Sequence, residues 1–304
     1  MIGSSRTILL FKTGRLDDFS QGQPENVYLP TLWGPALLNL VNTAAEIRRL
    51  SLQAIDAARS GHPGGSLSVA DILAVLYFEE LRVDPKEPAA ESRDRFILSK
   101  GHACPALYAA LALKGFFSVD ELLKLRKLSG FMEGHPDVRI PGVDAPSGSL
   151  GMGLSQGLGM ALGARIRGLD FRTYVVLGDG DMQEGNTWEA IMAAGAKKVD
   201  SLVAILDSNR LQGDAPVSQQ LDVGDFSNRL AAFNWNTIKI DGHDLDQIRK
   251  AFDVARQTKS KPTFIEASTI KGKGVSFMEN ELYWHGSVAM KEEEISQALS
   301  ELSN

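Results

Sequence analysis

Two short segments of the sequence place oxygen-bearing side chains at a spacing that suits metal binding. Asp179 lies between Gly178 and Gly180, and Asn209 follows 30 residues later, two residues before Leu211. A carboxylate, a side-chain amide and a loop carbonyl are hard oxygen ligands. They suit Mg²⁺ or Ca²⁺ when phosphate oxygens complete the coordination. The glycines let a phosphate approach the backbone closely, so the pattern predicts a site for a metal and a phosphate group.

Three other interpretations of this segment have to be weighed. Gly-Asp-Gly standing alone is commonly a turn. An EF-hand calcium loop is excluded, because Glu184 and Ala190 occupy the positions that require glycine and glutamate. Asp179 and Asp181 together also match a phosphatase-type nucleophile that follows a strand, although Asn209 at its distance fits that interpretation less well.

The five histidines of the chain all lie next to glycine, on segments that are typical of loops; they are His62, His102, His135, His243 and His285. A single histidine is usually a surface or core residue, but five in such positions weaken that interpretation. Imidazole near its ordinary pKa can donate to and accept from hydroxyl and carbonyl groups, which a sugar presents in number. We interpret His243, in an Asp-Gly-His-Asp segment, as part of a structural turn.

Strands and helices must position these groups. An apolar run over 173–177 is followed by a helical pattern over 187–197 and by a second apolar run over 202–206. Strand, helix, strand is typical of a βαβ unit with parallel strands, and the interval from Asp179 to Asn209 matches one such crossover. Both residues would then lie at the carboxyl ends of neighbouring strands, where open α/β sheets bind ligands. The intervening helix would direct its positive end at the bound anion.

The remaining pattern predicts further strands at 95–99, 236–240 and 263–267, and helices at 37–60, 69–81, 105–114, 153–167 and 245–258. We expect the glycines between 61 and 65 to break the first helix, and Ser68 to cap the second, with Asp71 in its first turn. The expected fold class is α/β, a mostly parallel sheet with helices on both faces. Residues 1–36 would form an N-terminal extension, and 37–304 a single domain.

Composition excludes several classes of protein. The chain has 304 residues, 43% of them hydrophobic and 23% charged, which is typical of a globular protein with a large core. A net charge of −6 argues against nucleic acid as a partner. Cys104 is the single cysteine, so no internal disulfide forms and a reducing compartment is expected. No apolar run reaches the roughly 18 residues of a membrane span, and the first residues lack a signal-peptide pattern, so we expect a cytoplasmic protein.

The Gly-Asp-Gly segment followed by Asn209 resembles the thiamine-diphosphate motif of the transketolase family. The resemblance implies that Asp179 and Asn209 are side-chain ligands of Mg²⁺, or of Ca²⁺ in its place, and that the Leu211 carbonyl is the third ligand. It also implies that the Gly180 amide contacts the diphosphate. Thiamine diphosphate and a divalent metal are therefore the expected cofactors.

The segments around four histidines also resemble transketolase. His62 lies in Ser-Gly-His-Pro-Gly, His102 in Ser-Lys-Gly-His-Ala, His135 in Gly-His-Pro and His285 in Trp-His-Gly. The resemblance implies that His62 and His285 handle protons on the substrate hydroxyl and carbonyl. His102 would lie near the diphosphate and the substrate, and His135 would contact hydroxyls of the donor sugar.

Four further residues acquire roles from the same resemblance. Lys100 and Lys271 match lysines beside the cofactor, although a solvated lysine is the plain alternative. The backbone of Gly148 and Leu150 would hold the aminopyrimidine of the cofactor. This glycine-rich stretch differs from a dinucleotide-binding motif, because no clear strand precedes it and its glycine spacing does not match.

The resemblance extends over about 37–291 and corresponds to the first, diphosphate-binding domain of transketolases. Their second domain supplies the glutamate that activates the cofactor and most contacts to the sugar phosphate, and no segment here matches it. The chain is therefore expected to be the N-terminal subunit of a split transketolase, which transfers a two-carbon ketol unit from a ketose to an aldose. A separate C-terminal subunit would complete an α2β2 heterotetramer. Glu184 and Glu189 would lie at a subunit interface, where the plain alternative is a solvated helix face.

Three related classes remain as alternatives. A half-enzyme of the 1-deoxyxylulose-5-phosphate synthase type fits less well, since the loops at His62 and His102 look more like transketolase. Decarboxylating dehydrogenase subunits share the Gly-Asp-Gly and Asn pattern but not the four histidine segments. A non-catalytic, Mg²⁺-dependent binding or regulatory subunit would have no need of the histidines, so alanine at His62 and His285 distinguishes it from an enzyme.

Overall fold

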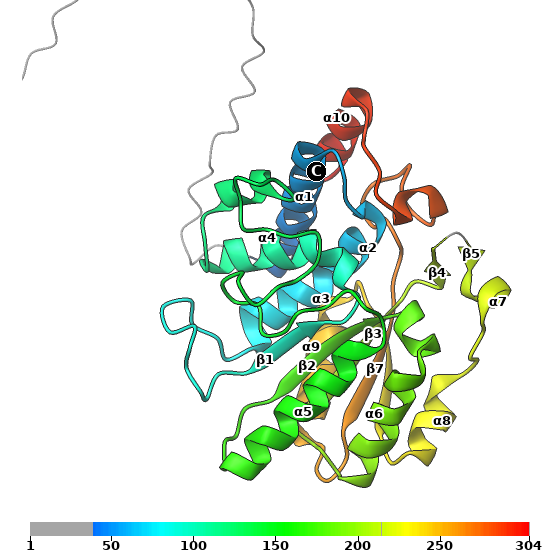
Figure 1. The fold of residues 1–304 in the computed structure, drawn as a ribbon. Helices are drawn as coiled ribbons and strands as arrows, with labels where there is room; N and C mark the ends of the chain where they lie inside the picture. Colours follow the sequence, from blue (N-terminus) through cyan, green and yellow to red (C-terminus); the bar gives the residue numbers. More distant parts are fainter. Residues whose placement is uncertain (1–38, 214, 304) are drawn as a thin grey trace, which may run out of the picture. The chain divides into compact units, whose positions relative to one another are not determined.

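The computed structural model describes residues 39–213 and 215–303 (Figure 1). In that part of the chain, five parallel strands form one sheet in the order β1-β2-β3-β7-β6. They are β1 (Arg95–Leu98), β2 (Thr173–Gly178), β3 (Leu202–Ser208), β6 (Asn236–Asp241) and β7 (Thr263–Ser268). Each predicted strand is found, with ends that differ by one or two residues. The N-terminal extension expected over 1–36 lies outside the described residues.

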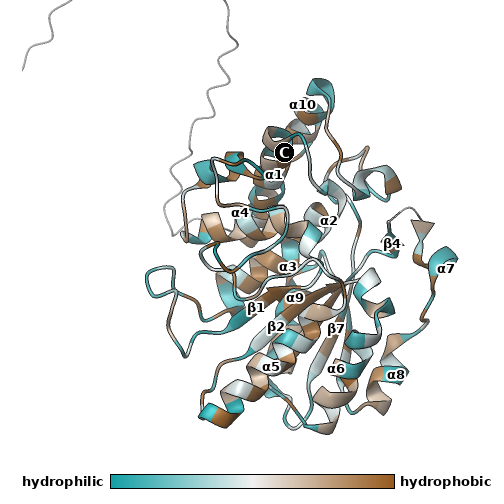
Figure 2. Ribbon diagram, viewed as in Figure 1, coloured by the Kyte–Doolittle hydropathy of each residue, from teal (hydrophilic) through white to brown (hydrophobic). Residues whose placement is uncertain are grey.

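The alternation of side chains along the central strands divides the core into two clusters. Tyr174 and Val176 of β2 face one cluster, and Val175 and Leu177 face the other. Residues of α1 (Leu40–Ala58), α3 (Ala70–Val75), α4 (Cys104–Lys114) and α9 (Leu245–Gln257) complete the first; residues of α5 (Met152–Arg167), α6 (Gly185–Ala196) and α8 (Phe226–Ala232) complete the second. Figure 2 shows the apolar strands enclosed by these helices. The predicted α/β fold, with helices on both faces of a parallel sheet, is confirmed.

A third, smaller cluster fixes the segment that follows β7. Leu52 and Ile55 of α1 pack with Trp284 and with Ile295 of α10 (Glu292–Glu301). Trp284 also donates from its indole nitrogen to the Phe277 carbonyl at 3.1 Å. The packing holds a 3₁₀ turn, Leu282–His285, against the rest of the domain. A histidine far along the chain is thereby fixed near α1.

The glycine segment breaks the first helix as expected: α1 ends at Ala58, and the short helix α2 (Pro63–Ser68) begins inside the segment, with Pro63 in its first turn, where its ring and missing N–H are tolerated. Two other predictions for this region are wrong. Ser68 is the last residue of α2 and caps nothing. Its buried hydroxyl instead donates to Asp207 at 2.6 Å. The single helix predicted over 69–81 is α3 followed by a π-helical turn, Leu76–Glu80.

Short elements complete the carboxyl edge of the sheet. A two-stranded antiparallel pair, β4 (Leu211–Gln212) and β5 (Ala215–Pro216), leads into α7 (Val217–Gln220). A 3₁₀ turn, Asp179–Gln183, follows β2, and another, Gly101–Ala103, follows β1. Among the described residues, none of the helices is long and apolar enough to cross a membrane.

Candidate active site

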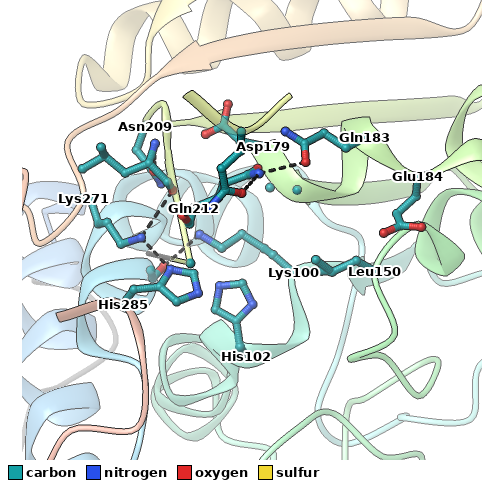
Figure 3. A pocket seen from close by; sticks show the side chains of 16 residues that line it. Lys100, His102, Leu150, Asp179, Gln183, Glu184, Asn209, Gln212, Lys271 and His285 are labelled. Carbon is teal, nitrogen blue, oxygen red and sulfur yellow. Dashed lines mark hydrogen bonds between the residues drawn. The ribbon is translucent and has the colours of Figure 1, made fainter. Parts of the chain in front are cut away.

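The three expected metal ligands lie together at the carboxyl edge of the sheet. Asp179 directly follows β2 and Asn209 directly follows β3, and these strands pair in a register that sets Gly178 opposite Asp207. Leu211 begins β4 nearby. All three ligands line one cavity of about 270 Å³ (Figure 3). The crossover spacing in the sequence therefore predicted correctly which residues meet.

Most residues predicted for the site line the same cavity. Those in its wall are Lys100, His102, Leu150, Asp179, Gly180, Asn209, Leu211, Lys271 and His285. His62, His135 and Gly148 lie outside that wall. Figure 3 shows that side chains from before α4, after β3 and after β7 converge on one space.

Asp179 carries a charge that nothing in the described chain neutralises directly. Its side chain is almost fully buried, and no lysine or arginine of the described residues lies within ion-pair distance of it. Burial, reinforced by the Asp207 carboxylate, raises the pKa of Asp179 to about 6, although the Arg210 amide donates to it at 2.9 Å. A divalent cation at this position would supply the missing positive charge.

The donor set also fits that cation. One carboxylate, one amide oxygen and one carbonyl form a hard-oxygen set of the kind that Mg²⁺ takes with phosphate oxygens. Among the described residues, no group of three or more histidine, cysteine or acidic side chains is arranged so that it could hold a metal ion by itself. A Cβ at position 180 would lie only 3.0 Å from Leu150 Cδ1, so a larger residue would crowd this part of the cavity. Glycine at this position keeps that space free.

Asp181, two residues further on, is part of the framework and not of the cavity. It is fully buried and accepts hydrogen bonds from the Ser99 hydroxyl at 2.6 Å and from the Gly151 and Gly178 amides at 2.8 Å each. These bonds tie the ends of β1 and β2 to the start of α5. A carboxylate held in this way is not available as a second catalytic acid, so the phosphatase-type interpretation is not supported.

Three of the four predicted histidines form a cluster. The ring centroids of His62 and His102 are 5.3 Å apart, those of His102 and His285 also 5.3 Å, and those of His62 and His285 6.1 Å. His135 lies against Gly148 instead, where an added Cβ would be 2.8 Å from its ring. Gly148 also has a φ of +137°, so glycine is required there for both reasons.

The electrostatic surroundings keep the clustered rings neutral. Burial and the cations Arg126 and Lys271 lower the pKa of His62 to about 4, and burial and Lys271 lower that of His285 to about 4. Burial, with Lys100, holds the pKa of His102 well below its usual value, and burial with Arg126 lowers that of His135. At neutral pH each ring therefore offers one donor and one acceptor. The buried Nδ1 of His62 has no hydrogen-bond partner in the described structure, which is unusual unless a ligand provides one.

Both predicted lysines are buried, so the solvated alternative is wrong. Lys100 donates to the Gly65 carbonyl at 3.0 Å and forms an ion pair with Asp207. Lys271 contacts His285 Nδ1 at 2.6 Å and the Leu211 carbonyl at 3.3 Å. Burial and the nearby Lys100 lower the pKa of Lys271 to about 8. The charge of Lys100 is balanced by Asp207, whereas no carboxylate of the described residues forms an ion pair with Lys271, so Lys271 supplies positive charge that suits a diphosphate.

Comparison with known proteins identifies the family. The family model described as "Transketolase, thiamine diphosphate binding domain" matches residues 40–303. This chain belongs to the transketolase family. It therefore contains the family's thiamine-diphosphate-binding domain, and its family is one of transferases. The resemblance found in the sequence is confirmed.

The relatives are of two lengths. The chain is 41% identical to the 6-deoxy-6-sulfo-D-fructose transketolase subunit SqwG of a Clostridium strain, over 87% of this chain and 96% of that protein. It is 39% identical to an apulose-4-phosphate transketolase subunit of Phocaeicola vulgatus, over 84% and 91%. It is 45% identical to the transketolase of Homo sapiens over 81% of this chain, but spans only 39% of that protein. The solved transketolase of Leishmania mexicana superposes with a TM-score of 0.82 at 31% identity, over 88% of this chain and 42% of that one.

Some groups of this candidate site could not be found from the sequence. Gln183, Gln212 and Gln220 line the cavity opposite the histidines and bond to one another; Gln212 Nε2 donates to Gln183 Oε1 at 2.8 Å. Gln212 Oε1 is buried without a partner in the described chain. These glutamines belong to no recognisable sequence motif, so no signal in the sequence indicates that they line the cavity. Asp207, the partner of Lys100, was visible only as one more residue near Asn209.

The two acidic residues expected at a subunit interface are exposed in this chain. Glu184 is the N-cap of α6 and lines the cavity, and Glu189 lies in the first half of the same helix. Met152 and Met192, on α5 and α6, are exposed as well. The interface role of these glutamates in transketolase stays a prediction.

Proposed function

We propose that this chain is the N-terminal subunit of a split transketolase that transfers a two-carbon ketol unit from a ketose to an aldose. The observation that carries the proposal is its match to two transketolase subunits over more than nine-tenths of their lengths. The convergence of three neutral histidines beside the candidate diphosphate cavity supports it further.

In this proposal Asp179, Asn209 and the Leu211 carbonyl hold Mg²⁺, or Ca²⁺ in its place, and the Gly180 amide contacts the diphosphate. Lys271 adds positive charge, and Lys100 lines the same cavity. Gly148 and Leu150 hold the aminopyrimidine end. Thiamine diphosphate, when bound, supplies the carbon nucleophile for ketol transfer.

The histidines would act on the sugar. His62 and His285 exchange protons with the substrate hydroxyl and carbonyl, and His102 hydrogen-bonds between substrate and diphosphate. His135 contacts the donor hydroxyls. Their lowered pKa values keep both rings neutral, so that each can accept a proton or hydrogen bond at one nitrogen and donate a hydrogen bond from the other.

The proposed assembly is an α2β2 heterotetramer with a separate C-terminal subunit. That subunit would provide the glutamate that activates the cofactor, with Glu184 and Glu189 near the contact. The exposure of both glutamates on one helix is compatible with such a contact. The substrates we propose are anionic sugars, because the two subunit relatives are named for a sulfonated and a phosphorylated sugar.

Calorimetric titration of thiamine diphosphate with Mg²⁺ tests the proposal, using the chain with and without a candidate C-terminal subunit from the same genome. Tight binding and ketol transfer are expected only with the partner, measured with a donor panel that includes sulfonated and phosphorylated ketoses. Full ketol transfer by this chain alone would contradict the split-enzyme proposal. Binding without transfer by any donor would favour a regulatory subunit.

A further inference from the structure

The histidine that the proposed mechanism leaves unused, His243, lies in a buried hydrogen-bond network. Its side chain is 13% exposed, and its Nδ1 lies 2.7 Å from Asp71 Oδ2. On the other side of the ring, Nε2 accepts a hydrogen bond from the Ile270 amide at 2.8 Å. Both ring nitrogens are therefore bonded, and the plane of the ring is fixed.

These two bonds also define the tautomer. The Ile270 amide can only donate, so Nε2 must carry a lone pair and the ring proton must lie on Nδ1. That proton points at Asp71. Burial alone would raise the pKa of Asp71, but hydrogen bonds from His243 and Arg48 hold it below its usual value, which keeps the carboxylate charged.

The network is anchored in the helical layer. Arg48 of α1 forms an ion pair with Asp71 of α3 and donates from Nε to the Leu67 carbonyl at 3.1 Å. Both charged side chains are about nine-tenths buried. His243 thus connects a rigid pair of helices to the loop that follows β7.

That loop carries a residue of the proposed site. Ile270 is followed by Lys271, whose ammonium lies 2.6 Å from His285 Nδ1. The stem of Lys271 runs tightly against α2, since a Cβ on Gly64 would come within 2.9 Å of Lys271 Cγ. The loop is also bonded on either side of Ile270, where the Thr269 amide donates to the Ser208 carbonyl and the Gly272 amide to the Gly64 carbonyl of α2. Between them, the Ile270 amide adds a separate connection, through His243 and Asp71, to α3.

We propose that His243 is a positioning residue for Lys271: through the Ile270 amide, it sets the place at which the lysine ammonium meets His285. The inference deepens the proposed function, on which the importance of Lys271 and His285 rests. Misplacement of a site group by about 1 Å is enough to lower a rate by roughly a hundredfold. A ring that is locked at both nitrogens limits such movement.

The first test uses the full chain without cofactor or partner. With five histidines, ¹⁵N-histidine labelling gives a small set of ring signals that single substitutions assign. At pH 7.5 we expect His243 to show a protonated Nδ1 and a hydrogen-bonded, unprotonated Nε2. The opposite tautomer, or exchange between the two, would overturn the proposal whether or not the chain is a transketolase.

Matched substitutions test the effect at a distance. His243→Gln can accept from Ile270 and donate to Asp71, whereas His243→Leu can do neither. We expect the ring signals of His285 to keep their positions in the glutamine variant and to shift in the leucine variant, with melting temperatures measured for both. A folded leucine variant with unchanged His285 signals would contradict the proposal. If that variant fails to fold, the tautomer measurement and the glutamine variant still decide.

A double-substitution cycle tests the route through Lys271 in the complete complex. His243→Leu is expected to lower kcat about tenfold or more, with a smaller effect on KM. In the Lys271→Met background the same change should cause no further loss, because the residue through which it acts is gone. Fully additive losses would show that His243 acts elsewhere. An inactive wild-type complex would instead contradict the proposed function and leave the tautomer result intact.

Discussion

Residues of the same type make different numbers of hydrogen bonds in two regions of the molecule. One is the cavity wall, made of the residues that line the cavity. The other is the frame, the buried residues that support it, of which Asp181 and His243 are examples. Asp179 and Asp181 are separated by one residue, and both are buried. Asp181 accepts three short hydrogen bonds. Asp179 has one amide at 2.9 Å and a long contact of 3.5 Å from the Ser208 hydroxyl. One carboxylate is satisfied by the protein, and the other is left for a ligand.

The histidines show a similar contrast, here between His243 and His62, which lies outside the wall but beside His102 and His285, which line the cavity. Both nitrogens of His243 are bonded, whereas the buried Nδ1 of His62 has no partner in the described chain. Buried polar groups are nearly always satisfied, so an unsatisfied one calls for an explanation. For these two pairs of residues, the hydrogen bonds of the side chain distinguish the candidate site from the frame, whereas the residue type does not.

The largest effect is expected at His62 and His285. Alanine at either position should lower ketol transfer by the complete complex about 10²- to 10⁴-fold, because a group that moves protons is lost. Steady-state rates give the effect, and size-exclusion chromatography checks that the complex still assembles. Unchanged rates in an intact complex would place these rings in the frame and favour the non-catalytic alternative.

Substitution of Asp179 should act on binding. Asp179→Ala is expected to weaken Mg²⁺-dependent binding of thiamine diphosphate by about 100-fold or more, since a charged ligand to the metal is removed. Titration calorimetry measures the affinity, and thermal unfolding without cofactor is the control, where no loss is expected. Wild-type affinity in this variant would refute the metal assignment.

Substitution of Asp181 should act on stability instead. In Asp181→Asn an NH₂ group replaces an acceptor that faces a backbone N–H, which should lower the free energy of unfolding by about 3 kcal/mol. Urea unfolding at pH 7 measures it. The matched Asp179→Asn variant should be as stable as the wild type or more so. Equal losses in the two variants would erase the distinction between wall and frame.

The smallest effect is a difference in pH dependence. Because the pKa of Asp179 is raised to about 6 in the folded chain, the protonated carboxyl favours folding at low pH. That contribution is lost as the pH rises from about 4 through 6. Relative to Asp179→Asn, the wild type should lose about 2 kcal/mol of stability between pH 4 and pH 7. The buried histidines act in the opposite direction in both proteins and cancel in the difference. A flat difference would contradict the raised pKa.

The sequence predicted the parts of this structure that depend on periodicity. Short apolar runs such as 202–206, separated by a helix-length segment, indicate buried parallel strands, and the structure has strands there. The positions of Asp179 and Asn209 at the strand ends follow from that arrangement. In a parallel sheet all strands end at the same edge, so the residues that follow the strands lie close together there. The metal-site candidates could therefore be placed from chain spacing and strand direction.

What the sequence did not predict depends on contacts between distant segments. Ser68 has the residue type of a helix cap, but a buried carboxylate on β3 takes its hydroxyl. The role of Asp181 depends on Ser99 and Gly151, both far away in the chain. The glutamines of the cavity and the π-helical turn at 76–80 leave no local pattern. For Ser68 and Asp181, hydrogen bonds to distant segments decided the outcome, and no local propensity reports such bonds.

The strand order bears on how the chain folds. β2 and β3 pair across a single crossover, whereas β7 reaches β3 only after the chain has passed through α7, α8, β6 and α9. Contacts between distant segments form late, because loop closure costs entropy before any pairing is gained. Asp179 and Asn209 should therefore meet early in folding, and Lys271 and His285 should arrive last. A nascent chain would bring the proposed metal ligands together for some time before Lys271 and His285, two further residues of the proposed site, are in place.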